Sequence, residues 1–201
     1  MTYSLIKQGS EEWHAERAKR LTASDFGAAL GVNPYCSRQK LWRIKVGLET
    51  VGDNIHITRG RDNEQQAIFE YSVETGHWVD EVGLVVHPAH DWLGASCDGL
   101  VGDSGLVEVK CPVQIRAGPP AYHMAQVLGQ LEVTARDWCD YWQWTREGTS
   151  CIRIARDPAW WARALPVLER FWGYVIKLEQ PPKGSCRMRA LAKSSLLEEI
   201  L

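Results

Sequence analysis

Residues 95–112 contain the feature that most restricts the fold of this chain, a predicted β-hairpin with alternating polar and apolar positions. We expect Asp98 to end one strand and residues 102–105, which begin and end with glycine, to form a tight turn. Glu108 and Lys110 lie two residues apart in the returning strand, so their side chains share one face. The valines that alternate with them lie on the opposite face, which predicts a hairpin packed against a core.

The segments around this hairpin predict helices and strands in a mixed order. We expect helices from Ser10 onward and over residues 25–30, 37–47, 61–74, 122–133 and 159–177, and strands over residues 77–87, 92–96, 105–110, 138–145 and 151–155. This order predicts an α/β (α+β) fold in which helices flank a central mixed sheet. We expect a single domain over residues 1–201, with residues 183–201 as a peripheral tail that carries several cations.

Composition excludes several classes of protein. With 45% hydrophobic and 24% charged residues, the chain has the composition of an ordinary globular domain. This composition excludes a disordered, collagen-like or coiled-coil protein. It lacks an apolar stretch of about 20 residues and a secretion signal, so we expect a cytoplasmic protein with no membrane partner. The net charge of −2 argues against nonspecific coating of nucleic acid but is compatible with a DNA enzyme.

The polar face of the predicted hairpin combines two carboxylates, Asp98 and Glu108, with the ammonium group of Lys110. Carboxylates that converge repel each other unless a cation or a shared proton compensates. Mg²⁺ prefers one or two carboxylates together with water and phosphate oxygens, and a nearby lysine can orient water or offset developing charge. This set fits phosphodiester hydrolysis, although a Glu–Lys pair on a surface hairpin has the same spacing.

At this point the sequence resembles a known family. The segment Asp98-Gly99-Leu100 followed by residues 105–112 is similar to the PD-(D/E)xK (restriction-endonuclease-like) core of λ-exonuclease-like (YqaJ-type) phage recombination exonucleases, with Cys97 where the motif has proline. Other segments match in the same order, namely Trp13-His14-x-x-Arg17 with Leu21-Thr22-Ala23-Ser24, Gly60-Arg61-x-x-Glu64, and Tyr122-x-x-x-Gln126-Val127. The resemblance runs from about residue 13 to residue 144, which is most of the chain.

The resemblance implies a catalytic metal site. Asp98 and Glu108 would bind Mg²⁺ through their side chains and Val109 through its backbone carbonyl, and Mn²⁺ would substitute for Mg²⁺. Glu64 would reach the metal through a water molecule or a second cation. Lys110 would activate the attacking water.

It also implies a position for the nucleophile and a pocket for a terminal 5′-phosphate. Gln126 would orient the nucleophile and Lys110. Arg17, Thr22, Ser24 and Ser96 would hold the phosphate, and an arginine fork with hydroxyls near a helix start is a ready anion site. Taken alone, the residues favour ordinary roles, with Arg17 as a solvated helix residue and Thr22 or Ser24 as the cap of the helix over residues 25–30.

Two weaker candidates complete the set. Ile57 lies where the family places a residue that wedges into the duplex end. His87 and His90 have a spacing compatible with zinc, but four-ligand structural sites require further ligands.

The function that the resemblance implies is a Mg²⁺-dependent 5′→3′ exonuclease. It would degrade one strand of linear double-stranded DNA to 5′-mononucleotides and leave 3′ overhangs for recombination by strand annealing. The implied partners are DNA ends, two further copies in a homotrimer and a single-strand annealing protein, in a bacterial host that carries the gene on a phage or prophage. Alternatives are an endonuclease of restriction or repair type, an inactive DNA-binding module, or a metal-free acid/base pair for glycoside hydrolysis.

Overall fold

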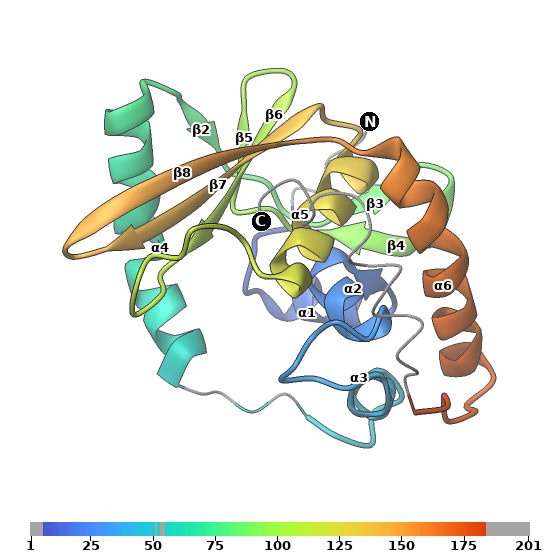
Figure 1. The fold of residues 1–201 in the computed structure, drawn as a ribbon. Coiled ribbons are helices and arrows are strands. Elements are labelled where there is room, and N and C mark those ends of the chain that lie inside the picture. The colour runs from blue at the N-terminus through green and yellow to red at the C-terminus, as the bar shows by residue number, and fades with distance from the viewer. Residues whose placement is uncertain (1–5, 51, 53–54, 184–201) are drawn as a thin grey trace.

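The computed structural model describes residues 6–50, 52 and 55–183. Its helices, shown in Figure 1, are α1 (Glu11–Ala18), α2 (Ala23–Ala29), α3 (Arg38–Lys45), α4 (Ile55–Thr75), α5 (Ala121–Thr134) and α6 (Pro158–Ile176). Its strands are β1 (Leu21–Thr22), β2 (Val79–Asp80), β3 (Val85–His87), β4 (His90–Ala95), β5 (Gly99–Val101), β6 (Gly105–Lys110), β7 (Trp138–Thr145) and β8 (Gly148–Ala155). Within the described residues, no helix combines the length and the apolarity needed to cross a membrane.

The strands form mixed sheets flanked by helices, so the predicted fold class is confirmed, but the strands divide into two sheets. A three-stranded sheet has the order β1-β4-β3, and a five-stranded sheet has the order β2-β5-β6-β7-β8. The predicted strand over residues 77–87 is in fact two short strands, because β2 pairs with β5 whereas β3 pairs with β4. Residues 81–84 carry the chain from one sheet to the other.

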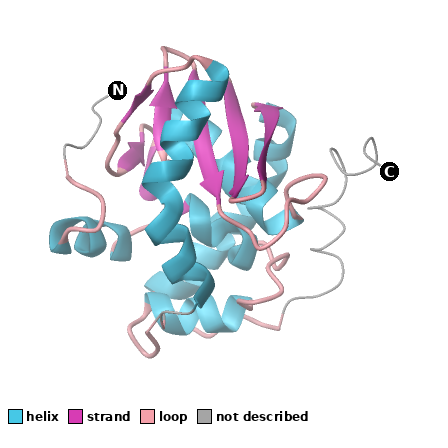
Figure 2. Ribbon diagram, turned by 90° about the vertical axis from the view of Figure 1, so that its left-hand side faces the viewer, coloured by secondary structure: helices cyan, strands magenta, loops and turns pink. Residues whose placement is uncertain are grey.

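The larger sheet is covered on both faces, and this determines which residues of β6 face the site. Strands β6 and β7 are parallel and are joined through α5, as in a β-α-β crossover. Val107 and Val109 pack with Ala67 and Tyr71 of α4, whereas Leu106 packs in the cluster that includes α5. Figure 2, which views the molecule from the side of α4, shows this long helix lying across the strands of the sheet. Glu108 therefore faces α5.

The hairpin differs from the prediction at its first strand. Asp98 does not end a strand; it precedes β5, whose Gly99 pairs with Val107 of β6. Strand β4 ends at Ala95, and the next residues pass from the small sheet to the large one. Asp98 is therefore located where the two sheets meet.

Helices α2 and α5 pack closely through glycines. A Cβ atom on Gly27 would lie 2.7 Å from the Cβ of Tyr122, and one on Gly129 would overlap the ring of Phe26. Because Gly27 and Phe26 belong to α2 and Tyr122 and Gly129 to α5, the two helices touch at both points.

Other boundaries differ from the sequence-based expectation. Helix α4 begins at Ile55, six residues before its predicted start. The candidate wedge Ile57 falls in its first turns, but the side chain lies outside the described residues. Most of the predicted basic tail, residues 184–201, also lies outside them.

Candidate active site

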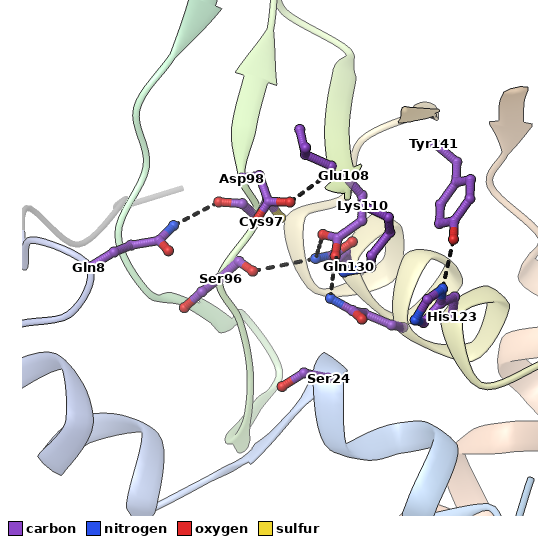
Figure 3. Close-up of polar contacts among 12 residues, drawn as sticks. Gln8, Ser24, Ser96, Cys97, Asp98, Glu108, Lys110, His123, Gln130 and Tyr141 are labelled. Carbon is purple, nitrogen blue, oxygen red and sulfur yellow. Dashed lines mark hydrogen bonds and ion pairs between the residues drawn. The ribbon is translucent and has the colours of Figure 1, made fainter. Parts of the chain in front are cut away.

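The carboxylate of Glu108 is held by donors from two elements. Its Oε1 accepts hydrogen bonds from Lys110 Nζ and from Gln126 Nε2, the latter at 2.6 Å, and its Oε2 accepts one from Gln130 Nε2 at 2.6 Å. Figure 3 shows the side chains of α5 pointing toward this carboxylate, whose residue is only 1% exposed. The predicted pairing of Glu108 with Lys110 on one strand face is present, and α5 adds two amides one helical turn apart.

Asp98, the residue just before β5, lies beside this group. Its Oδ2 accepts a hydrogen bond from the backbone N–H of Val109 at 2.7 Å. Burial raises the pKa of Asp98 well above its usual range, and the negative charge of Glu108 raises it further, while Lys110 opposes the shift. We call Asp98, Glu108 and Lys110 the carboxylate site.

Charges within the carboxylate site act strongly on one another. Burial alone would lower the pKa of Lys110, but the charges of Glu108 and Asp98 outweigh that effect and raise it. Glu64 of α4 is half-buried, and its pKa is raised by burial and then by the charge of Glu108. The structure therefore brings Glu64 near the carboxylate site.

The oxygen atoms of this site suit a hard cation. Asp98 and Glu108 supply two carboxylates, and Mg²⁺ is usually bound by one or two carboxylates with water and substrate oxygens. A carboxylate has about four acceptor positions, and on Glu108 three of them accept hydrogen bonds from protein donors. Burial and then the negative charge of Glu108 raise the pKa of Asp98, and a bound cation would favour its ionised form. The donor set and its charge therefore fit Mg²⁺ or Mn²⁺.

A second group of predicted residues gathers around Trp13. Arg17 Nη2 donates to Ser24 Oγ at 2.9 Å, and the hydroxyls of Thr22 and Ser24 lie 3.1 Å apart. The Arg17 guanidinium lies over the Trp13 ring, 4.4 Å from its centroid, and Trp13 Nε1 donates to Ser96 Oγ at 3.0 Å. We call Arg17, Thr22, Ser24 and Ser96 the hydroxyl pocket. Trp13 contacts two of its members, Arg17 and Ser96.

The hydroxyl pocket adjoins the carboxylate site. Burial lowers the pKa of Arg17, and the negative charges of Asp25 and Glu108 oppose that shift. Ser96 also accepts a hydrogen bond through its main-chain carbonyl from Gln130 Nε2 at 3.3 Å. An anion bound by Arg17 would therefore lie next to the carboxylates.

Sequence reasoning gave no role to several residues that the structure places at the site. Gln130 follows Gln126 by one helical turn, and that spacing was the only available signal. His123 Nδ1 lies 2.6 Å from Tyr141 Oη. Burial and the charges of Lys110 and Arg116 lower the pKa of His123 to about 3, so its ring is neutral at pH 7.

The zinc candidates gain no further ligand. The rings of His87 and His90 lie 4.9 Å apart, and His87 Nδ1 accepts a hydrogen bond from the Ala89 backbone at 3.1 Å. Among the residues that the structure describes, no three histidine, cysteine, aspartate or glutamate side chains gather closely enough to enclose a metal ion. Mg²⁺ at the carboxylate site would thus depend on two carboxylates with main-chain and water oxygens.

Comparison with known proteins supports the same interpretation. Residues 12–137 match the model of the YqaJ-like viral recombinase domain. The fold matches the crystal structure of an alkaline exonuclease (LHK-Exo) from Laribacter hongkongensis, with a TM-score of 0.75 and 29% identity over 96% of this chain and 100% of that chain. A structure of LHK-Exo in complex with dAMP matches with a TM-score of 0.76 and 28% identity over the same shares of the two chains.

A curated relative is much longer than this chain. Uncharacterized protein R354 of Acanthamoeba polyphaga mimivirus is 29% identical over 160 residues, which is 69% of this chain but only 29% of that protein. The family match spans more than half of the chain, and the predicted resemblance to λ-exonuclease-like recombination nucleases is confirmed. The chain belongs to the family of the YqaJ-like viral recombinase domain.

Proposed function

We propose that this protein is a deoxyribonuclease, and more specifically a Mg²⁺-dependent 5′→3′ exonuclease. It degrades one strand of linear double-stranded DNA to 5′-mononucleotides and leaves a 3′ single strand. The observation that carries the proposal is the carboxylate site of Asp98, Glu108 and Lys110 with the hydroxyl pocket beside it. The family match and the likeness to an alkaline exonuclease support the enzyme class.

Asp98, Glu108 and the backbone carbonyl of Val109 would hold Mg²⁺. When bound, the ion supplies positive charge at the phosphate oxygens and lowers the pKa of a water molecule. Lys110 stays protonated between the two carboxylates, so it orients the attacking water and offsets charge on the phosphate in the transition state.

Two further residues place the water molecules. Gln126 donates one N–H group to Glu108, and its amide carbonyl can accept a hydrogen bond from the nucleophile. The negative charge of Glu108 acts on the pKa of Glu64, so the Glu64 carboxylate lies near enough to bind the ion through water.

The hydroxyl pocket provides the polarity of cleavage. Arg17 with the hydroxyls of Thr22, Ser24 and Ser96 grips the terminal 5′-phosphate through charge-assisted hydrogen bonds. This contact fixes the scissile bond relative to the carboxylate site, and a misplacement of about 1 Å can cost on the order of a hundredfold in rate.

The biological setting is part of the same proposal. The protein acts in the cytoplasm of a bacterial host as a phage or prophage product, assembles as a homotrimer and supplies 3′ strands to a single-strand annealing protein. Ile57 is the proposed wedge at the duplex junction.

The decisive assay compares labelled linear duplexes that carry a 5′-phosphate or a 5′-hydroxyl with a closed circular duplex, in Mg²⁺ or in a chelator. We expect metal-dependent release of mononucleotides from the 5′-phosphorylated ends and no cutting of the circle. Cutting of the circle would support the endonuclease alternative, and binding of DNA without hydrolysis would support an inactive binding module.

A further inference from the structure

Gln130 is a buried polar residue in the middle of α5 that the proposed chemistry has not used. It is 1% exposed and is surrounded along the helix by the buried side chains of Val127, Leu131 and Val133. Its Nε2 lies 2.6 Å from Glu108 Oε2 and 3.3 Å from the carbonyl oxygen of Ser96. One amide therefore spans the carboxylate site and the hydroxyl pocket (Figure 3).

The orientation of this amide is determined by its neighbours. The Glu108 carboxylate and the Ser96 carbonyl are both acceptors, so only the NH₂ end of Gln130 can face them. The other end, Oε1, is buried and has no hydrogen-bond partner among the described residues. Because an unsatisfied buried acceptor is unfavourable, an apolar side chain of the same length would suit this part of the core better.

The hydrogen bonds to Glu108 explain why this position has an amide and not an apolar side chain. Lys110 and Gln126 both bond to Oε1, and the terminal torsion of a glutamate is broad. Contacts to one oxygen leave the carboxylate plane free to rotate about that oxygen. Within the part of the chain that the structure describes, Gln130 alone donates to Oε2, so it fixes the plane.

We propose that Gln130 is a positioning residue that fixes the plane of the Glu108 carboxylate against the main chain of Ser96. The inference rests on the proposed function, since the oriented carboxylate is a ligand for Mg²⁺. Ser96 is itself held from the other side, because its hydroxyl accepts a hydrogen bond from Trp13 Nε1. Gln130 thus ties the carboxylate to the same backbone segment that lines the hydroxyl pocket.

The test uses two replacements at this position. Gln130→Met keeps the length of the side chain and removes the donor, and Gln130→Asn keeps the amide but is too short to reach Glu108. Thr134→Val is the matched control, because Thr134 lies one turn further along α5, is equally buried and bonds only to the backbone carbonyl of Gln130. Circular dichroism and thermal melting verify that each variant is folded.

Mg²⁺ affinity is measured by calorimetry on the full chain without DNA, and kcat and KM are then measured on linear duplex. Loss of residues that orient a metal ligand typically weakens metal affinity or activity by about 10–100-fold. We expect both Gln130 variants to bind Mg²⁺ that much more weakly and to lose kcat with little change in KM, while Thr134→Val behaves as the wild type. A purely structural role would instead lower the melting temperature and leave the Mg²⁺ affinity of the folded variant unchanged.

The outcomes separate this inference from the proposed function. If the wild type hydrolyses DNA with Mg²⁺ and either folded Gln130 variant stays within twofold of it in Mg²⁺ affinity and kcat, the positioning role is wrong. Melting losses in both Gln130 variants with unchanged Mg²⁺ affinity would overturn it as well. A wild type that neither binds Mg²⁺ nor hydrolyses linear duplex overturns the proposed function and the positioning role together.

Discussion

The carboxylate site and the hydroxyl pocket are neighbours, but their side chains are held in different ways. Glu108 lies in a central strand, is almost fully buried and accepts bonds from three donors. Ser24 is exposed at the start of the seven-residue helix α2, and Arg17 comes from the eight-residue helix α1, of which no residue is buried. Glu108 and Lys110 are part of the larger sheet, whereas Arg17 and Ser24 lie on short helices.

Under the proposed function, this difference separates the groups that take part in hydrolysis from the groups that select the substrate. Side chains on a sheet that is packed on both faces keep their geometry with or without a ligand, as a catalytic site requires. Residues on short helices can be replaced with a smaller loss of core stability. We therefore expect changes in the carboxylate site to affect every DNA substrate equally, and changes in the hydroxyl pocket to affect only substrates with a 5′-phosphate.

The largest effect should follow Lys110→Met, which removes the ammonium group and preserves the length of the side chain. Because a positioned donor that stabilises charge in the transition state contributes about 10²–10³-fold, we expect a rate loss of that size on 5′-phosphate and 5′-hydroxyl ends alike. Initial rates on end-labelled duplexes measure it, with the exposed Lys177→Met as the control. A loss confined to one type of end would contradict the separation of the two groups.

A smaller and selective effect should follow Arg17→Ala. A hydrogen bond to a charged group contributes about 1.5–3 kcal/mol, so digestion of 5′-phosphorylated ends should slow by roughly 10- to 150-fold. The slower reaction on 5′-hydroxyl ends should change little. Lys19→Ala, which removes an exposed cation next to α1, serves as the control. Equal losses on both ends would mean that Arg17 does not hold the phosphate.

The smallest effect concerns stability and pH in the carboxylate site. Because the folded pKa of Asp98 is raised, the folded state holds more protons than the unfolded state between about pH 3.9 and that raised value. Stability contributed by this group therefore falls as the pH rises through this window. Asp98→Asn should not show this fall in stability. In a chelator, the difference in melting temperature between the variant and the wild type should therefore widen as the pH rises, by about 2–4 °C for each kcal/mol of stability.

Mg²⁺ provides the complementary arm of this experiment. The ion should stabilise the wild type most at the upper end of the window, where Asp98 is ionised, and should have little effect on Asp98→Asn. Parallel pH profiles of melting temperature for the two proteins would contradict the assignment of a raised pKa to Asp98.

The sequence predicted local parts of the site and missed the parts that depend on packing. The pairing of Glu108 with Lys110 was predictable, because a period of two residues is a property of any strand. Strands β1 and β5 are two and three residues long, too short to produce a pattern, so the location of Asp98 between the sheets was not predictable.

The same contrast applies to caps and helix faces. Thr22 and Ser24 were equal candidates to cap α2, and the structure selects Thr22, whose backbone N–H donates to Asp25 at 3.0 Å. That leaves the Ser24 hydroxyl to meet Arg17. The contact of Gln130 with Glu108 depends on how α5 lies over β6, which only the assembled core determines.

The glycine contacts between α2 and α5 have a consequence for the dimensions of the site. Helix α2 carries Ser24 and α5 carries the amides that hold Glu108, and the two helices meet at Gly27 and Gly129. A methyl group at either glycine would push the helices apart and increase the distance from the Ser24 hydroxyl to the Glu108 carboxylate. Under the proposed function, the distance between the bound 5′-phosphate and the bond to be cut therefore depends on the absence of a side chain at Gly27 and Gly129.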